Sequence, residues 1–256
     1  MDTPEWWEVY HKQHRDFREW VLDGPEVLDS TQDILRFLAK REHSRVLHIG
    51  CGSSTLHKDL LKVGFSTVVN VDFDEAVIQR MVDQHAAENV QFRVADVRDL
   101  ANADLGPLFD CVVGKGLFDC LLSNGTEEHK ENNVLRVLKS LKAVMKPHAM
   151  VVETSMFEEK KRRPYMELGG LFEVKVVVVE LNPLELPHQK CSFIYILVPK
   201  LGSETESGKT GRTEQDEEEE QDNDDEIPVI NQDKSATTAT ADTSGVAIPS
   251  AEVDAS

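Results

Sequence analysis

The chain has 256 residues and a formal net charge of −19 at pH 7, from 47 Asp and Glu against 28 Lys and Arg. Residues 202–256 contain 16 of these acidic residues and only 3 of the basic ones, so the preceding part of the chain is mildly acidic. This balance argues against direct nucleic-acid binding, which needs a concentrated basic surface, and no apolar run is long enough to cross a membrane.

The periodicity of apolar residues along 27–198 predicts alternating helices and strands. Asp74 has the side chain of a helix N-cap, and Gly64 has the backbone freedom expected just past a helix end. In chain order, we expect a helix over 27–40, a strand over 46–49, a helix from the following turn to 63, a strand over 67–71, a helix after Asp74, a strand over 90–94, a strand over 109–113, a helix over 127–145, a strand over 150–154, and two closing strands over 171–180 and 192–198.

These elements predict an α/β fold. Apolar strands separated by helices favour a parallel sheet covered on both faces, and two final strands without a helix between them favour an antiparallel closing pair. We therefore predict a Rossmann-like, doubly wound sheet of seven strands with the last strand antiparallel and helices on both faces. Residues 1–201 would form this one domain.

Residues 202–256 are rich in Ser, Thr, Asp, Glu and Gly and contain no aromatic residue. Such a segment buries too little apolar area to offset its ordering entropy, so we predict a disordered acidic tail. Its role is either that of a solubilising tail or that of an acidic docking arm for a basic partner.

The four cysteines, Cys51, Cys111, Cys120 and Cys191, form no Cys-x-x-Cys pair and no metal-ligand spacing. We interpret them as free thiols in a reducing compartment and predict no metal site. Acidic residues at positions 2, 5 and 8 interrupt any signal peptide, so the expected location is the cytoplasm.

Glycines and carboxylates follow three successive predicted strands, where open α/β sheets bind ligands. Gly50 and Gly52 follow the first strand and would let the backbone approach an adenosine-containing cofactor. Asp72 would accept hydrogen bonds from ribose hydroxyls, and Asp96 would accept one from the adenine amine. The lack of a further glycine near position 55 favours a cofactor without phosphates. Each residue also has a structural alternative: a turn glycine, a partner of the following helix cap, or a turn-forming aspartate.

Five stretches of sequence carry a resemblance to a known family. They are Trp6-Trp-Glu-Val-Tyr10 with Phe17-Arg-Glu-Trp20, Gly50-Cys-Gly-Ser-Ser54, Val69-Asn-Val-Asp-Phe73, Ala95-Asp-Val97, and Phe109-Asp-Cys-Val-Val-Gly-Lys-Gly-Leu-Phe-Asp119. The chain resembles the class I, seven-strand S-adenosylmethionine-dependent methyltransferases. Within that class it is similar to the branch of the elongation factor 1-alpha lysine methyltransferases and their methyltransferase-like relatives. The resemblance covers nearly all of residues 1–200 and none of the tail.

The resemblance implies a cofactor, S-adenosyl-L-methionine, and a set of contacts. Residues 1–26 would be an amino-terminal lid over the cofactor, although the aromatic residues there could instead pack a helix on the domain. The implied lid contacts are Trp6, Tyr10 and Trp20, the implied cofactor contacts are Gly50, Gly52, Asp72, Phe73, Asp96 and Val97, and Lys115 would lie beside the methionine end.

Three residues depart from the family pattern. His48 stands where many methyltransferases have an acidic residue pointing toward the methionine amine. In the branch, the pattern after the fourth strand reads Asp/Glu-Lys-Gly-Thr-x-Asp, whereas this chain has Gly114 before Lys-Gly and Leu117 after it. The last two departures fall next to the predicted transfer site.

The expected reaction is methylation of a protein lysine, with a translation elongation factor as a candidate substrate. A lysine nucleophile, whose reference pKa is about 10.4, must be neutral when it attacks. The candidate catalytic residues are Lys115, Asp119 and Glu153, and either carboxylate could equally cap a helix or pair with Lys115. The alternatives are a small-molecule methyltransferase and a non-catalytic scaffold of methyltransferase fold that uses the acidic tail as a docking arm.

Overall fold

A computed structural model describes residue 9 and residues 24–180 and 191–200. The predicted lid contacts Trp6, Tyr10 and Trp20 and the predicted tail 202–256 lie outside the described residues, so the interpretations of both segments stay predictions.

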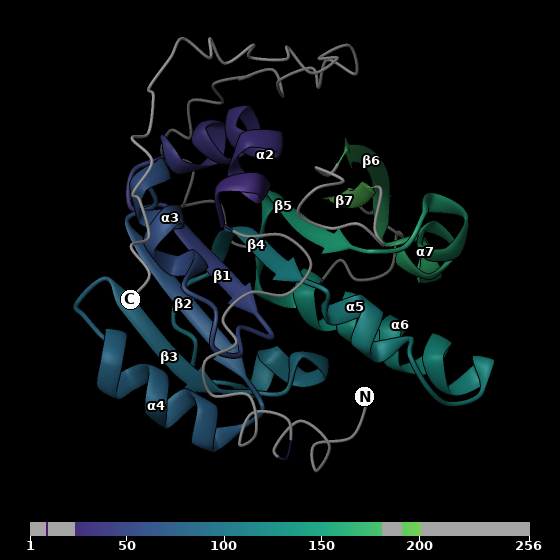
Figure 1. The fold of residues 1–256 in the computed structure, drawn as a ribbon, viewed down its shortest axis with the longest axis horizontal. Coiled ribbons are helices and arrows are strands. Elements are labelled where there is room, and N and C mark those ends of the chain that lie inside the picture. Colours follow the sequence, from purple (N-terminus) through teal and green to yellow (C-terminus); the bar gives the residue numbers. More distant parts are fainter. Residues whose placement is uncertain (1–8, 10–23, 181–190, 201–256) are drawn as a thin grey trace, which may run out of the picture.

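The described chain alternates between helices and strands, as Figure 1 shows. Its elements in chain order are α2 (Gly24–Ala39), β1 (Arg45–Ile49), α3 (Leu56–Val63), β2 (Thr67–Asp72), α4 (Glu75–His85), β3 (Val90–Val94), the 3-10 helix η1 (Val97–Asn102), β4 (Phe109–Lys115), α5 (Leu117–Leu121), α6 (Glu127–Val144), β5 (Met145–Ser155), α7 (Glu159–Met166), the 3-10 helix η2 (Leu168–Gly170), β6 (Phe172–Glu180) and β7 (Cys191–Pro199).

The strands form one seven-stranded sheet in the order β3-β2-β1-β4-β5-β7-β6 (Figure 1). The pairs among β1 to β5 are parallel, and β7 lies antiparallel between β5 and β6. The predicted fold class, including the antiparallel last strand, is confirmed. Chain order reverses between β1 and β4, and such a switch point is where doubly wound sheets bind ligands at their C-terminal strand ends.

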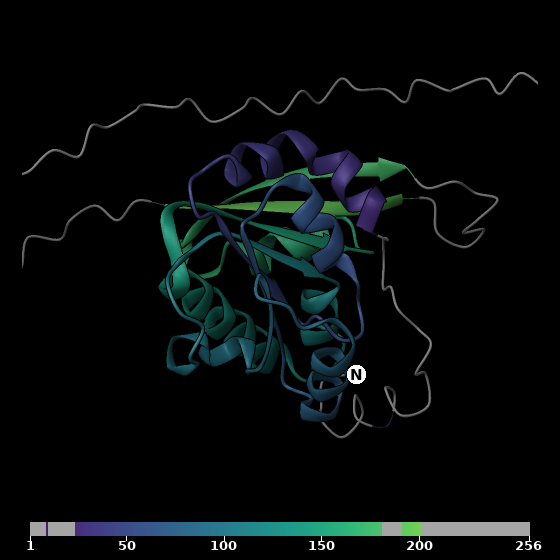
Figure 2. The same cartoon turned by 90° about the vertical axis from the view of Figure 1, so that its left-hand side faces the viewer.

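Two hydrophobic layers cover the two faces of the sheet. On one face, residues of α2 and α3 such as Leu35 and Leu60 pack against Val46, Cys111 and Ile194. On the other face, α6 and η1 pack against the opposite side chains of the same strands. Figure 2 shows α2 (purple) and α6 (teal) on opposite sides of the sheet. Among the described helices, none has both the length and the apolar character needed to cross a bilayer.

Local capping agrees with the sequence prediction at both predicted positions. Gly64 has φ +123° and donates its N–H to the carbonyls of Leu60 and Leu61, as expected at a helix end. Asp74 accepts hydrogen bonds from the N–H groups of Ala76 and Val77 and so caps α4.

The structure differs from the prediction on the side of the sheet where β4 and β5 end. β4 extends to Lys115, because Gly114 and Lys115 continue the parallel pairing with β5. β5 begins at Met145, directly after α6, so Pro147 lies within the strand and not in a loop. Two short helices, α5 and α7, follow these strands where sequence analysis predicted none. The α7 sequence is polar and contains Pro164, which hides the helical pattern.

Candidate functional site

The glycine turn after β1 has a left-handed backbone conformation and packs against α5. Gly50 and Gly52 have φ values of +57° and +48°, the left-handed region that glycine adopts without strain. A Cβ at Gly50 would lie 3.1 Å from Cδ1 of Leu117, so the turn packs directly on the start of α5. Both positions therefore favour glycine for their conformation, and at Gly50 the close approach of Leu117 also leaves little space for a side chain.

Asp72 ties this turn to the end of β2. Its Oδ2 accepts the Gly52 N–H at 2.9 Å, and its Oδ1 accepts the Asp74 N–H at 3.0 Å. A carboxylate oxygen can accept more than one hydrogen bond, which suits contact with ligand hydroxyls. The next residue, Phe73, exposes 40% of its surface, which is unusual for an aromatic side chain and suits contact with a ligand.

Asp96 follows β3 and is held by Arg98. The Arg98 guanidinium donates from Nε to Oδ1 at 2.9 Å and from Nη2 to Oδ2 at 2.6 Å, a two-point contact. Burial alone would raise the pKa of Asp96, but hydrogen bonds from Arg98 outweigh it and the pKa is lowered. Asp96 is therefore an ionised acceptor in a fixed orientation. The neighbouring Val97 side chain packs in the core.

Lys115 ends β4 and is only 7% exposed. Burial lowers its pKa from 10.5 to about 7, which favours the uncharged amine far more than in an exposed lysine. A buried lysine in this state can accept a proton as well as donate one.

Asp119 on α5 forms hydrogen bonds with the end of β5, the residue that follows it, and α7. Its carboxylate accepts from Ser155 Oγ at 2.6 Å, from the Met156 N–H at 2.9 Å and from Arg162 Nε at 2.8 Å. Both Asp119 and Arg162 are almost fully buried, so this is a buried ion pair that fixes α7 on the end of β5. These contacts indicate that Asp119 has a positioning role.

Glu153 on β5 is the other predicted carboxylate, and its surroundings differ. It is fully buried, its Oε1 accepts the Phe118 N–H at 3.1 Å, and its Oε2 has no hydrogen-bond partner among the described residues. Burial is the largest cause that raises its pKa well above the ordinary value. The two neighbouring carboxyl groups thus differ in their surroundings, because among the described residues Asp119 is paired with an arginine and Glu153 is not.

His48 is a buried neutral histidine in β1. Its Nδ1 lies 3.0 Å from Oδ1 of Asn70, and the Asn70 amide donates to the Gln91 carbonyl, which fixes the orientation of Asn70. Nδ1 must therefore carry the proton, and Nε2 is an acceptor without a partner among the described residues. Burial lowers the pKa of His48 to about 4, so it supplies no positive charge at neutral pH.

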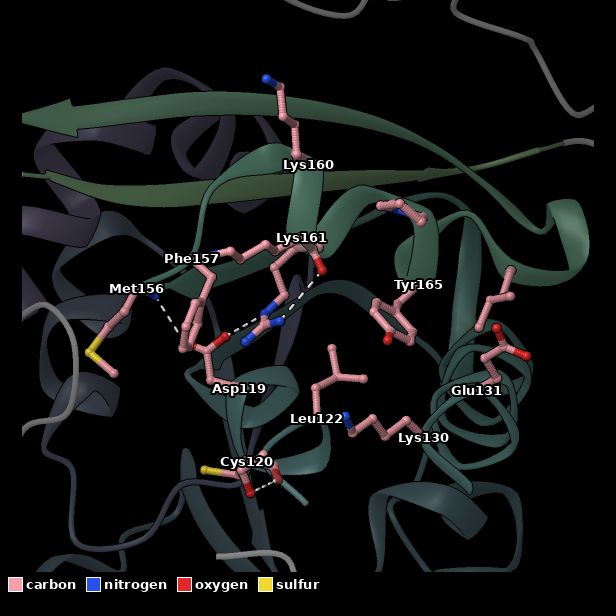
Figure 3. Close-up of a pocket in the computed structure, with 14 residues that line it drawn as sticks. Asp119, Cys120, Leu122, Lys130, Glu131, Met156, Phe157, Lys160, Lys161 and Tyr165 are labelled. Atoms are coloured by element: carbon pink, nitrogen blue, oxygen red, sulfur yellow. Dashed lines mark hydrogen bonds and ion pairs between the residues drawn. The ribbon is translucent and has the colours of Figure 1, made fainter. Parts of the chain in front are cut away.

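A cavity of about 690 Å³ lies beside Asp119, between α5, the start of α6 and α7. Figure 3 shows Tyr165 of α7 facing Leu122 and Lys130, with Met156 and Phe157 on the other side. The Arg162 guanidinium carbon lies 4.1 Å from the Phe157 ring centroid, a cation–π contact that holds the wall in place. The lining combines apolar side chains with charged ones, and the charged residues are Asp119, Lys130, Glu131, Lys160, Lys161 and Arg162.

Sequence reasoning missed the residues that α7 contributes to this cavity, above all Arg162 and Tyr165. The only sequence signal was the basic run Lys160–Arg163, which on its own is typical of a solvated surface. The predicted cofactor contacts Gly50, Gly52, Asp72 and Phe73 do lie around one turn, and Asp96 follows the adjacent edge strand. Across the described part of the chain, no group of three or more His, Cys, Asp or Glu is arranged to hold a metal ion.

Comparison with known proteins points to one family. The model of the family described as "Methyltransferase domain" matches residues 13–194. The chain is 28% identical over 205 residues to EEF1A lysine methyltransferase 2 of Homo sapiens, which covers 75% of this chain and 80% of that protein. Its Danio rerio counterpart is 24% identical over 164 residues, covering 60% of this chain and 69% of that protein. The human eEF1A lysine and N-terminal methyltransferase is 30% identical over 144 residues, which span 55% of this chain and 20% of that protein.

Solved structures agree on the fold. A TehB-like S-adenosylmethionine-dependent methyltransferase from Corynebacterium glutamicum has a TM-score of 0.50 at 16% identity, covering 77% of this chain and 100% of that chain. An S-adenosylmethionine-dependent methyltransferase from Clostridium acetobutylicum has a TM-score of 0.50 at 9% identity, covering 77% and 98%. At these identities the likeness supports the fold alone.

Proposed function

The chain belongs to the methyltransferase domain family and is a class I S-adenosylmethionine-dependent methyltransferase, and from this premise we propose that it methylates a lysine side chain of a protein. The relatives named as EEF1A lysine methyltransferases make an elongation factor the first candidate substrate. The structural observation that supports an acceptor site is the cavity beside Asp119, which α5 links to the glycine turn.

The glycine turn fits the cofactor. Gly50 and Gly52 would present backbone without a Cβ, Asp72 would accept from ribose hydroxyls, and Phe73 would contact the adenosine. Asp96 would accept from the adenine amine, with Arg98 fixing its orientation. The predicted lid of residues 1–26 completes this proposal.

S-adenosylmethionine supplies a methyl group on a sulfonium that is already activated for displacement, so the protein mainly contributes orientation and exclusion of water. Asp119 and Arg162 would hold the cavity walls in register with the end of β5. Lys115 ends β4 and is not among the residues that line the cavity, so its proposed place remains beside the methionine end of the cofactor, as the resemblance implies.

A small-molecule acceptor is the second candidate function. The cavity volume of about 690 Å³ falls in the range of sites that bind small molecules. The two functions predict different methylated products: proteins of a cell extract in the first case and small molecules of the extract in the second.

The test incubates the protein with tritiated S-adenosylmethionine and cell extract, then with purified elongation factor 1-alpha. We expect a labelled protein band and labelled methyl-lysine after hydrolysis. Asp72→Asn should weaken cofactor binding by about tenfold or more, because a hydrogen bond to a charged group contributes about 1.5–3 kcal/mol. Asp83→Asn, at an exposed position on α4, is the matched control and should leave labelling unchanged.

The outcomes separate the hypotheses. Label that appears only in small molecules would make the protein-substrate proposal wrong. A protein that fails to bind S-adenosylmethionine in calorimetry would favour the non-catalytic scaffold.

A further inference from the structure

The Glu153 carboxyl group occupies a space that only a glycine on the neighbouring strand leaves open. Gly114 of β4 pairs with Glu153 of β5, so both face the same side of the sheet. A Cβ at Gly114 would overlap Oε2 of Glu153 and lie 3.1 Å from Cγ1 of Ile49, the last residue of β1. The buried Oε2 therefore lies next to the end of β1, where the glycine turn starts.

A second contact places the same carboxyl group behind the cofactor turn. Oε1 accepts the N–H of Phe118, and the preceding residue, Leu117, packs on Gly50. Glu153 thus supports the first turn of α5 from one side while the glycine turn contacts it from the other. A charge arriving at the glycine turn would act on this carboxyl group through the buried interior, where electrostatic effects are stronger than in solvent.

Among the described residues around Glu153, no cation is paired with its carboxyl group. Asp119 and Cys120 approach from α5, Arg162 from α7 and Tyr195 from β7. Arg162 is engaged with Asp119, and the Tyr195 hydroxyl donates to the Phe157 carbonyl. Lys115 follows Gly114 in β4 and so lies on the opposite face of the sheet. Burial and Asp119 both raise the pKa of Glu153 and so favour its protonated form.

We propose that Glu153 is a proton-linked counter-charge for the cofactor, protonated in the protein alone and ionised when the sulfonium-bearing S-adenosylmethionine is bound. On binding, the O–H bond of Glu153 breaks and its proton passes to the solvent, so the carboxylate balances the added positive charge. After methyl transfer the remaining thioether is uncharged, and Glu153 takes up a proton again. The inference rests on the proposed cofactor site, because it requires the sulfonium to lie near the glycine turn.

Calorimetry with two ligands tests this inference. S-adenosylmethionine and S-adenosylhomocysteine differ by the methyl group and the positive charge on sulfur, so titrating each in phosphate and in Tris buffer at pH 7 measures the protons released. We expect close to one proton released with S-adenosylmethionine and close to none with S-adenosylhomocysteine. In Glu153→Gln the release should disappear, whereas Glu173→Gln, at an exposed position on β6, should release the same number as the wild type.

The pH dependence of affinity gives a second measure. Release of one proton makes S-adenosylmethionine bind about tenfold more tightly at pH 7 than at pH 6 in the wild type, and equally at both in Glu153→Gln. Equal proton release by both ligands, or release that persists in Glu153→Gln, would overturn the inference while leaving the proposed function intact. Absence of binding by S-adenosylmethionine would instead overturn the cofactor site. If Gln at position 153 prevents folding, the comparison of the two ligands in the wild type still decides.

Discussion

Replacing Gly114 with alanine tests whether the strand packs as closely against Glu153 as the structure indicates. The added methyl group would overlap Oε2 and lie 3.1 Å from Cδ of Glu153, so the carboxyl group must move. Overpacking a core costs about 1–3 kcal/mol. The movement would also break the hydrogen bond from the Phe118 N–H, which costs about 1–3 kcal/mol for a buried group. We expect Gly114→Ala to lower the free energy of unfolding by about 2–6 kcal/mol, the sum of these two costs.

A double-mutant cycle in urea denaturation isolates the contact. Glu153→Ala removes the side chain that Gly114→Ala would strike, so the double variant should be more stable than the sum of the two single effects by about 2 kcal/mol. Gly170→Ala is the control, because a Cβ there meets nothing within 4 Å and only its φ of +63° is strained. Its effect should add to that of Glu153→Ala. Additivity of Gly114→Ala with Glu153→Ala within about 0.5 kcal/mol would refute the packing argument.

Three further predictions concern stability and capping. The pKa of His48 is about 4 in the folded protein and 6.5 in the unfolded chain, so the unfolded chain binds the proton first as pH falls. The free energy of unfolding should therefore drop by up to about 3 kcal/mol between pH 6.5 and pH 4. Urea denaturation across this range should show a weaker drop in His48→Gln than in the wild type. Arg162→Met leaves the Asp119 carboxylate buried without its partner and should cost about 3–5 kcal/mol, of which Asp119→Asn in the same chain restores a part, as thermal unfolding would show. Asp74→Ala removes the α4 cap and should cost about 1 kcal/mol in the same assay without changing cofactor affinity, and a loss of affinity would contradict its capping role.

The sheet and the glycine turn could be predicted because their determinants are local. Strands such as residues 68–71 within β2 are short, largely apolar runs between helices, and the structure gives the strand Val90–Val94 the predicted bounds. The turn requires residues without a Cβ at positions 50 and 52, and Asp72 follows the neighbouring strand in parallel register. Chain order and strand register together bring these residues to one edge of the sheet.

The cavity could not be predicted because its walls come from tertiary contacts. Helix α7 has no apolar stripe, and it is held on the domain by the Arg162–Asp119 ion pair and the Phe157 ring. Neither contact leaves a periodic pattern in the sequence, and Pro164 favours a break. Met166 adds one buried apolar side chain, so most of what holds this helix becomes visible only when the contacting residues are placed in space.

The departure at Gly114 shows why a single position is a weak guide to activity. In the sequence, the departures at Gly114 and Leu117 were the support for a non-catalytic scaffold. In the structure, Glu153 of the paired strand extends its carboxyl group over Gly114, into the space that a side chain at that position would fill. An acidic group is therefore present at this edge of the sheet, although it comes from β5 and not from β4. Gly114 of β4 and the buried Glu153 of β5 belong to one packing arrangement. The glycine by itself is therefore no argument against methyl transfer.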